Sequence, residues 1–366
     1  MNFKQIMKIT KEQYFQRQTT LSEIGAKGQD LLQKAKVLVI GCGGLGSPIA
    51  IYLATSGVGE LHLVDFDTVS VSNLHRQVFF KVEDVHRPKV EVLANEIKKR
   101  APFTKVTFTN EAICKNFVLE LISNFDVVVD ATDSLPIKYL INDACVLVKK
   151  PLVYGSLYKF DGYVSTFNML NGDGDYTCNL RDAFPKIATD IPNCVEAGTL
   201  NPIVGIIALL QVNEVIKIIS KTGKLLTNQL LIYNALENSQ LKIKLKKNNS
   251  LIFEDIFRKS NYLDAHFTRQ ESALLISASE LKNRLKDENI EIVSILNNLD
   301  TILPFYVHQK IPNKSFDVEN FIPNFEKHYV IVCEKGITSY DVTLKLKEKF
   351  PSLNVFSLFE GIEKYA

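Results

Sequence analysis

The sequence predicts an α/β fold: a doubly wound parallel sheet extended by a strand-rich half, followed by a second, smaller α/β domain. Three observations lead to this expectation. Short β-branched segments alternate with amphipathic helical segments over the first third of the chain, strands and loops dominate after residue 150, and a polar run near residue 247 precedes a new strand-and-helix pattern. We therefore expect one domain over residues 1–247, a linker over 248–272 and a second domain over 273–366.

The composition is that of a globular chain with nearly balanced charge. Of 366 residues, 46% are apolar and 23% are charged, which argues against a disordered or collagen-like chain. The net charge of +2 gives no electrostatic reason to expect a nucleic-acid or membrane partner, and we expect neither. The first 18 residues are charged throughout and contain no apolar signal segment, so we expect a cytoplasmic protein.

The cysteines are widely spaced, and no Cys-x-x-Cys pair occurs. This spacing argues against a disulfide framework and against a four-thiolate zinc site, and it fits a reducing compartment. The six cysteines are Cys42, Cys114, Cys145, Cys178, Cys194 and Cys333.

The first third of the chain contains the elements of the parallel sheet. Residues 36–40, 61–64 and 127–129 are short β-branched apolar runs, typical of strands that are buried on both faces. Residues 47–55 and 89–100 between them have helical character. This alternation predicts βα units.

The strand-rich half follows residue 150. Residues 152–154 and 163–167 are predicted strands, and a segment rich in Asn, Gly and Asp follows them. The apolar stretch 202–219 is interrupted by polar and charged residues, so we expect a buried helix and not a membrane span. Residues 241–245 alternate apolar side chains with lysines, which predicts an edge strand with a solvated lysine face in preference to a basic binding patch.

A glycine-rich loop follows the first strand and opens a helix. In this context glycines let the backbone approach a phosphate, and the helix N-terminus directs N–H groups at it. Asp65 ends the second strand, where a carboxylate can bind ribose hydroxyls. The glycines are Gly41, Gly43, Gly44 and Gly46.

Cations after the second strand distinguish this loop from a dehydrogenase loop. Arg76 and Lys89 would stabilise negative charge as a triphosphate releases pyrophosphate, a role that a nicotinamide-dependent oxidoreductase does not require. Asp133 ends the third strand and can hold Mg²⁺, although a helix N-cap is its alternative role. The residues proposed to line the nucleotide here are Asp67, Ser72, Asn73, Leu74, His75, Arg76, Gln77, Lys89 and Asp133.

Several ordered motifs together resemble the MoeB/ThiF family, bacterial relatives of the ubiquitin-activating enzymes. They are the segment GCGGLGSPIA with its continuation to NLHRQ, the upstream YFQRQTTLSEIGAKGQ, and RPK, ATDS and CVEAG, which together cover about residues 10–247. The resemblance implies a Rossmann-like sheet and an adenylyltransferase that uses ATP and Mg²⁺. Its substrate would be the C-terminal glycine of a ubiquitin-like sulfur carrier protein.

The resemblance also implies roles for individual residues. Asp133 corresponds to the family's Mg²⁺ residue, and Arg17 to an arginine that reaches the nucleotide of a neighbouring subunit, which implies a homodimer. Cys194 matches a cysteine that forms a covalent link with the carrier in some members, although a small apolar residue anchoring a loop is the alternative. The ATP contacts carried over are Gly44, Asp65, Ser72, Asn73, Arg76, Lys89, Asp133 and Ser134.

The chain departs from the family pattern at several positions. Family members often bind zinc through two Cys-x-x-Cys pairs, but only Cys178 remains here, so we expect no zinc. His86 stands where glycine is usual, and Ser134 stands where asparagine is common.

The last third resembles a rhodanese-like domain around Cys333. Residues 329–332 form a predicted strand, and the loop 333–339 can place N–H groups around the sulfur at the start of a helix, which favours a thiolate and a persulfide. The match is incomplete, since residues 292–296 replace an Asp-Val-Arg motif and Glu360 replaces a glycine. We expect persulfide transfer at Cys333, with a degenerate structural domain as the alternative; a persulfide donor such as a cysteine desulfurase would then be a partner.

Other functions and several carriers remain open at this point. A nicotinamide-dependent oxidoreductase and a nonenzymatic nucleotide-binding scaffold are the two other classes. A MoaD-like carrier would indicate molybdopterin synthesis, a ThiS-like carrier thiamine thiazole synthesis, and a third carrier tRNA thiolation or conjugation. We favour a MoaD-like carrier and molybdopterin synthesis, because MoeB-like domains commonly carry a rhodanese-like domain.

Overall fold

A computed structural model describes residues 9–115, 117–185, 198–260, 262, 274–296, 301–312, 315–334, 336–359, 361–362 and 365. The chain divides into two compact units, Met1–Tyr262 and Leu263–Ala366.

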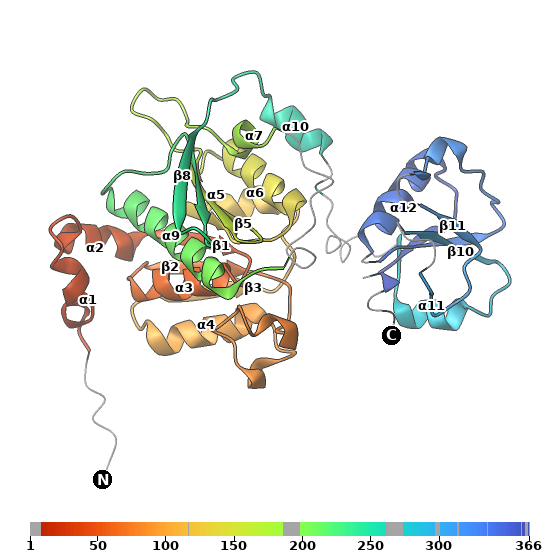
Figure 1. The fold of residues 1–366 in the computed structure, drawn as a ribbon, viewed down its shortest axis with the longest axis horizontal. Coiled ribbons are helices and arrows are strands. Elements are labelled where there is room, and N and C mark those ends of the chain that lie inside the picture. Colours follow the sequence, from red (N-terminus) through yellow and green to blue (C-terminus); the bar gives the residue numbers. More distant parts are fainter. Residues whose placement is uncertain are drawn as a thin grey trace, which may run out of the picture. The chain divides into compact units, whose positions relative to one another are not determined.

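The first unit is built on a mixed eight-stranded sheet in the order β3-β2-β1-β4-β5-β6-β7-β8 (Figure 1). Along the sheet, neighbouring strands pair in parallel from β3 through β2, β1 and β4 to β5. From β5 to β8 neighbouring strands pair antiparallel. The doubly wound sheet with an added strand-rich half is therefore confirmed. The strands are β1 (Lys36–Ile40), β2 (Glu60–Val64), β3 (Lys105–Thr109), β4 (Val127–Asp130), β5 (Leu152–Tyr158), β6 (Asp161–Phe167), β7 (Gln229–Asn234) and β8 (Ser239–Lys244).

Helices cover both faces of this sheet. Helices α3, α4 and α9 pack on one face, and α5 and α6 lie on the other (Figure 1). Two short 3-10 turns, η1 (Val71–Asn73) and η2 (Val82–Asp84), lie between β2 and α4. The helices are α1 (Lys11–Thr19), α2 (Gly25–Lys34), α3 (Gly46–Thr55), α4 (Lys89–Arg100), α5 (Val118–Ser123), α6 (Leu135–Leu147), α7 (Leu180–Ala183), α9 (Asn201–Ser220) and α10 (Phe253–Lys259).

The long apolar helix α9 is a core element of this unit. Within the described part of the chain it alone is long and apolar enough to cross a membrane, by length and composition only. It packs against β5, β6, α2 and α3, and Ile203, Ile207 and Val215 have no exposed surface. Such burial is typical of a core helix, as the sequence predicted.

Two details differ from the expected elements. Strand β8 is the predicted edge strand, but Leu241 (59% exposed) and Ile243 (42% exposed) are open to solvent as well as its lysines. The first unit also extends beyond residue 247, because α10 lies inside the predicted linker 248–272 and packs against α6. Lys115 bonds the carbonyl of Ser260, which helps to attach this segment to the first unit.

The second unit contains a five-stranded parallel sheet in the order β11-β10-β12-β13-β9. Its two faces carry separate apolar clusters, one including Leu346 of α12 and the other Leu281 of α11. Its elements are β9 (Leu275–Ile276), α11 (Ala278–Arg284), β10 (Ile290–Ile295), β11 (Gln309–Ile311), η6 (Val318–Asn320), β12 (His328–Val332), α12 (Ile337–Lys349) and β13 (Val355–Leu358).

Candidate active site

The glycine loop between β1 and α3 makes contacts that exclude side chains. Gly41 has φ +92°, and a Cβ there would lie 2.6 Å from the carbonyl oxygen of Ala131. A Cβ on Gly46, the first residue of α3, would lie 1.7 Å from the carbonyl oxygen of Gly41. The loop is thus packed against the end of β4, and α3 begins directly after it, as a phosphate site at a helix N-terminus requires.

Asp65, after β2, fixes the loop from the neighbouring strand. Its Oδ2 accepts a hydrogen bond from the Cys42 N–H at 2.6 Å, and its Oδ1 accepts one from the Asp67 N–H at 2.8 Å. A carboxylate has about four acceptor positions, so both oxygens keep capacity for ribose hydroxyls. Burial raises the pKa of Asp65, and the nearby Lys89 opposes this increase.

Lys89 is a buried cation at the first residue of α4. Its Nζ lies 2.8 Å from Oδ2 of Asp67, and only 4% of the residue is exposed. Burial alone would lower the pKa of Lys89, but the carboxylates of Asp65, Asp67 and Asp133 together raise it. Lys89 therefore keeps its charge beside the glycine loop, where it can bind a phosphate oxygen.

The segment after Asp67 brings further polar groups to this region. Arg76 Nη1 donates to the Ser72 carbonyl at 3.1 Å and contacts His75 Nε2 at 3.0 Å. Gln77 is 4% exposed, and its Oε1 has no hydrogen-bond partner among the described residues. A Cβ on Gly43 would lie 3.4 Å from Gln77 Nε2, so the Gln77 amide lies beside the loop.

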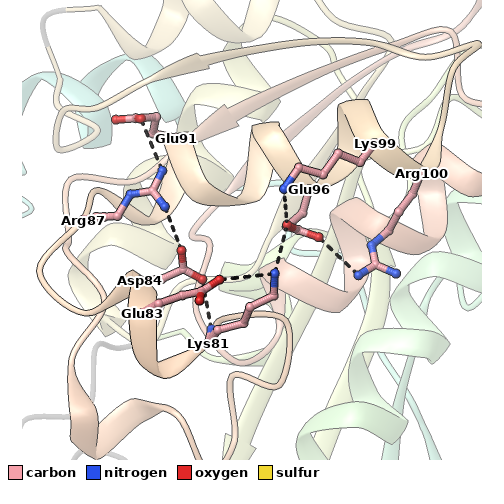
Figure 2. A network of polar contacts seen from close by, with 8 residues as sticks. All are labelled: Lys81, Glu83, Asp84, Arg87, Glu91, Glu96, Lys99 and Arg100. Atoms are coloured by element: carbon pink, nitrogen blue, oxygen red, sulfur yellow. Dashed lines mark hydrogen bonds and ion pairs between the residues drawn. The ribbon is translucent and has the colours of Figure 1, made fainter.

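A network of charged side chains holds the end of this segment on α4 (Figure 2). Glu96 accepts from Lys99 at 2.9 Å and Arg100 at 3.2 Å and pairs with Lys81 at 3.6 Å. Arg87 pairs with the buried Asp84 at 2.9 Å. The network anchors η2. Because Lys89 follows two residues after Arg87, the network also helps to fix the start of α4.

The turn after β4 shows that Asp133 is not the cap of the following helix. Ser134, and not Asp133, is the N-cap of α6, and its side chain accepts from the Ile137 N–H. The exposed Asp133 carboxylate is therefore not used in capping and acts on Lys89 through its charge. In the described part of the chain no three His, Cys, Asp or Glu side chains are grouped to hold a metal by themselves.

A buried ion pair supports this turn, and sequence reasoning missed it. Asp130 and Lys138 lie 3.0 Å apart and are 0% and 2% exposed. Asp130 also accepts from the N–H and hydroxyl of Thr132, and Lys138 donates to the Gly155 carbonyl at 2.8 Å. Both residues are ordinary in a strand and a helix, so no motif marks the pair.

Three residues that the sequence singled out, Arg17, Cys178 and Cys194, lie away from this cluster or outside the described part. Arg17 is exposed on α1, and no hydrogen bond or ion pair is found for it within the described chain. Cys194 lies outside the described residues. Cys178 is buried, its backbone N–H donates to Asn228 Oδ1, and burial raises the pKa of its thiol to about 11. His86, in the place of a glycine, has φ +71°.

Cys333 lies in the second unit, where β12 ends. Its Sγ accepts from the backbone N–H of Gly336 at 3.1 Å and of Ser339 at 3.3 Å, and the residue is 4% exposed. Gly361 packs on this loop, since a Cβ there would lie 2.4 Å from the Glu334 carbonyl oxygen. The neighbouring Glu360 lies outside the described residues. The loop thus directs N–H groups at the sulfur from the start of α12.

Comparisons with known proteins agree with this geometry. Residues 15–252 match the model of the ThiF family. The chain is 39% identical over 246 residues to a sulfur carrier protein adenylyltransferase of Thermus thermophilus, covering 66% of this chain and 91% of that protein. It is 36% identical over 290 residues to the adenylyltransferase and sulfurtransferase MOCS3 of Dictyostelium discoideum, covering 75% of this chain and 68% of that protein.

For some relatives, the match with this chain covers a smaller share of the relative's length. The probable adenylyltransferase/sulfurtransferase MoeZ of Mycobacterium tuberculosis is 39% identical over 238 residues, which is 64% of this chain and 60% of that protein. A solved structure of Escherichia coli MccB with ATP matches with a TM-score of 0.54 and 26% identity, covering 61% of this chain and 68% of that one. The chain therefore spans only about 60% of the MoeZ relative's length.

Proposed function

The chain belongs to the ThiF family, and we propose that it adenylates the C-terminal glycine of a ubiquitin-like sulfur carrier protein with ATP. The observation that carries the proposal is the buried Lys89 cation, held by Asp67 beside a glycine loop that begins a helix. The Thermus thermophilus relative is named for this activity on a sulfur carrier. Family membership argues against the alternatives of a nicotinamide-dependent oxidoreductase and of a nonenzymatic scaffold.

The nucleotide would lie along the carboxyl ends of β1, β2 and β4. Asp65 accepts the ribose hydroxyls, while Lys89 and Arg76 bind the phosphates together with the N–H groups at the start of α3. The structural match to MccB with ATP supports this placement.

Asp133 fits a magnesium ion that is shared with the phosphates. Mg²⁺ prefers oxygen ligands and is commonly held by one or two carboxylates together with phosphate oxygens and water, so a single free carboxylate is a sufficient protein contribution. When bound, the ion would neutralise charge on the phosphates. The cysteine pattern gives no comparable reason to expect zinc.

The reaction needs no general base. The carrier's C-terminal carboxylate is already ionised at neutral pH, and one of its oxygens forms a bond to the α-phosphorus while the bond to pyrophosphate breaks. Lys89 and Arg76 reduce the repulsion between the two anions and stabilise the leaving pyrophosphate. The product is an acyl-adenylate on the carrier.

The proposal extends to the assembly and to the cysteines. Arg17, exposed on α1, would complete the site of a second subunit in a homodimer. Cys194 would form a covalent intermediate with the carrier. Cys333 would carry a persulfide, received from a donor such as a cysteine desulfurase, whose outer sulfur attacks the acyl-adenylate and displaces AMP; a thiol reductant then releases the thiocarboxylate. The sulfurtransferase in the names of the MOCS3 and MoeZ relatives supports this second activity.

The identity of the carrier defines the pathway. We favour a MoaD-like carrier and molybdopterin synthesis over a ThiS-like carrier and thiamine thiazole synthesis, and we place the protein in the cytoplasm.

ATP–pyrophosphate exchange tests the proposal directly. The full chain is incubated with ATP, Mg²⁺, labelled pyrophosphate and either a MoaD-like or a ThiS-like carrier. Exchange that depends on one carrier supports adenylation and identifies the pathway. The matched control is the same carrier without its last glycine, which must abolish exchange. Exchange that is independent of any carrier would contradict the proposed substrate.

A further inference from the structure

Two buried serine hydroxyls lie behind Cys333. Ser339 Oγ is 3.3 Å from Cys333 Sγ, and Ser357 Oγ is 2.8 Å from Ser339 Oγ. Both serines are 0% exposed. Ser339 lies in the first turn of α12 and Ser357 on β13, where it is paired with Ile331 of β12. The hydroxyls therefore form a continuous line from the adjacent strand to the sulfur.

The hydrogen bonds in this line of hydroxyls run from Ser357 towards the sulfur. The geometry allows Ser357 to donate to Ser339, so the Ser339 oxygen accepts and its own hydrogen remains for the sulfur. Hydrogen bonds in such a chain strengthen one another, because each donor is polarised by the bond that it accepts. Thr343 also has a buried hydroxyl in α12, but it donates to the Ser339 carbonyl oxygen and is not part of the line.

We propose that Ser357 is a positioning residue for Cys333, acting through Ser339 to direct a hydroxyl hydrogen at the sulfur anion. This inference rests on the proposed role of Cys333 in sulfur transfer. The two backbone N–H groups and the Ser339 hydroxyl then give the sulfur three donors, which stabilise the thiolate that attacks the outer sulfur of a persulfide donor. A new sulfur–sulfur bond forms on Cys333, and the donor leaves as its thiolate.

The test is the pH dependence of Cys333 alkylation in the full chain, followed by mass spectrometry of the Cys333 peptide after treatment with iodoacetamide. In Ser357→Ala the midpoint of alkylation moves to higher pH, and sulfur transfer to the carrier falls about fivefold, the effect of one hydrogen bond. Ser339→Ala has a larger effect. The double variant resembles Ser339→Ala, because Ser357 acts only through Ser339.

Thr343→Val is the matched control, since it removes a buried hydroxyl from the same helix without interrupting the line. Its alkylation profile should equal that of the unmodified chain. An unchanged profile in a folded Ser357→Ala protein, an additive double variant, or an equal shift in Thr343→Val would each overturn the proposal. If the unmodified chain carries no sulfur on Cys333 but Ser357→Ala still shifts the alkylation profile, the positioning role of Ser357 is supported and the proposed sulfur transfer is contradicted.

Discussion

At the scale of single residues, the candidate site is a cation enclosed by carboxylates. Lys89 is buried, bonded to Asp67, and influenced by the charges of Asp65 and Asp133. Three negative groups around one lysine leave an excess of negative charge that a bare triphosphate would increase further. A divalent cation at Asp133 would offset this excess, which is the electrostatic reason to expect Mg²⁺ with ATP.

Replacement of Asp133 tests this role. Asp133→Ala should reduce ATP–pyrophosphate exchange roughly 10²-fold, because a group that stabilises charge in the transition state is lost. Its fold should be unaffected, since Ser134 and not Asp133 caps α6. Ser134→Ala is the matched comparison: it should cost about 1 kcal/mol of stability and reduce exchange less. Near-normal exchange in folded Asp133→Ala would remove this residue from the mechanism.

Asp65 predicts an acid limit for nucleotide binding. Burial raises its pKa, so the carboxyl group takes up a proton at a higher pH than an ordinary aspartate. A protonated carboxyl accepts fewer hydrogen bonds from ribose hydroxyls, so ATP affinity should decrease as pH falls through this raised pKa. Calorimetric titration of ATP binding between about pH 4 and 8 measures this decrease in affinity. The Asp65→Asn protein should not show the decrease at acid pH. A pH-independent affinity in the unmodified chain would count against Asp65 as the ribose ligand.

The sequence predicted part of this residue pattern. The glycine loop, Asp65, Lys89 and Asp133 are local motifs at the ends of strands, and parallel strands bring such ends to one edge of the sheet. The Asp130–Lys138 pair and the Ser357–Ser339 contact depend on packing between elements, so no local pattern shows them.

At the scale of elements, the charged network on α4 connects η2 to the helix that begins with Lys89 (Figure 2). The hydrogen bond from Lys99 lowers the pKa of Glu96, and Arg100 acts in the same direction. Because the folded-state pKa lies below the unfolded one, Glu96 contributes stability above the unfolded pKa, and this contribution is lost as pH falls through the folded-state value.

Glu96→Gln should therefore lower the free energy of unfolding by about 1 kcal/mol near neutral pH, and the loss should disappear in acid. Thermal unfolding at several pH values measures the difference. Glu83→Gln is the control, because Glu83 is 75% exposed and 3.7 Å from Lys81. Equal effects of the two substitutions, or an effect of Glu96→Gln that does not depend on pH, would contradict a specific role for Glu96.

Elements with strong local signals were predicted, and weaker ones were not. The central strands β1 and β4 are nearly continuous apolar runs and β2 contains Leu61, Leu63 and Val64, whereas the edge strand β3 has a single buried residue, Val106, and was missed. Helix α10 was assigned to a linker because its stability comes from packing on α6, which seven residues of sequence do not reveal.

At the scale of the whole molecule, the proposed homodimer would decide whether one chain contains a complete site. Arg17 is exposed on α1, and its proposed function lies in the site of a second copy. Arg17→Ala and Lys89→Ala proteins should each be inactive alone. After subunit exchange, a mixed dimer contains one site without either substitution, so exchange activity should return.

Mixing is measured with differently tagged protomers, so that mixed dimers are counted separately. The control is a mixture of Lys89→Ala with Asp133→Ala. Both residues belong to the site of one chain, so every site of a mixed dimer lacks one of them and activity should not return. Absence of recovery in Arg17→Ala with Lys89→Ala, despite demonstrated mixed dimers, would indicate that Arg17 acts within its own chain or not at all.

The central claim is that the first unit transfers an adenylyl group from ATP to a carrier protein. Intact-mass spectrometry of a carrier ending in Gly-Gly, after incubation with the full chain, ATP, Mg²⁺ and a pyrophosphatase, tests it most directly. The account predicts a carrier heavier by one adenylyl group, formed by the unmodified chain and not by Lys89→Ala. An unmodified carrier, with ATP converted to ADP and phosphate, would contradict it.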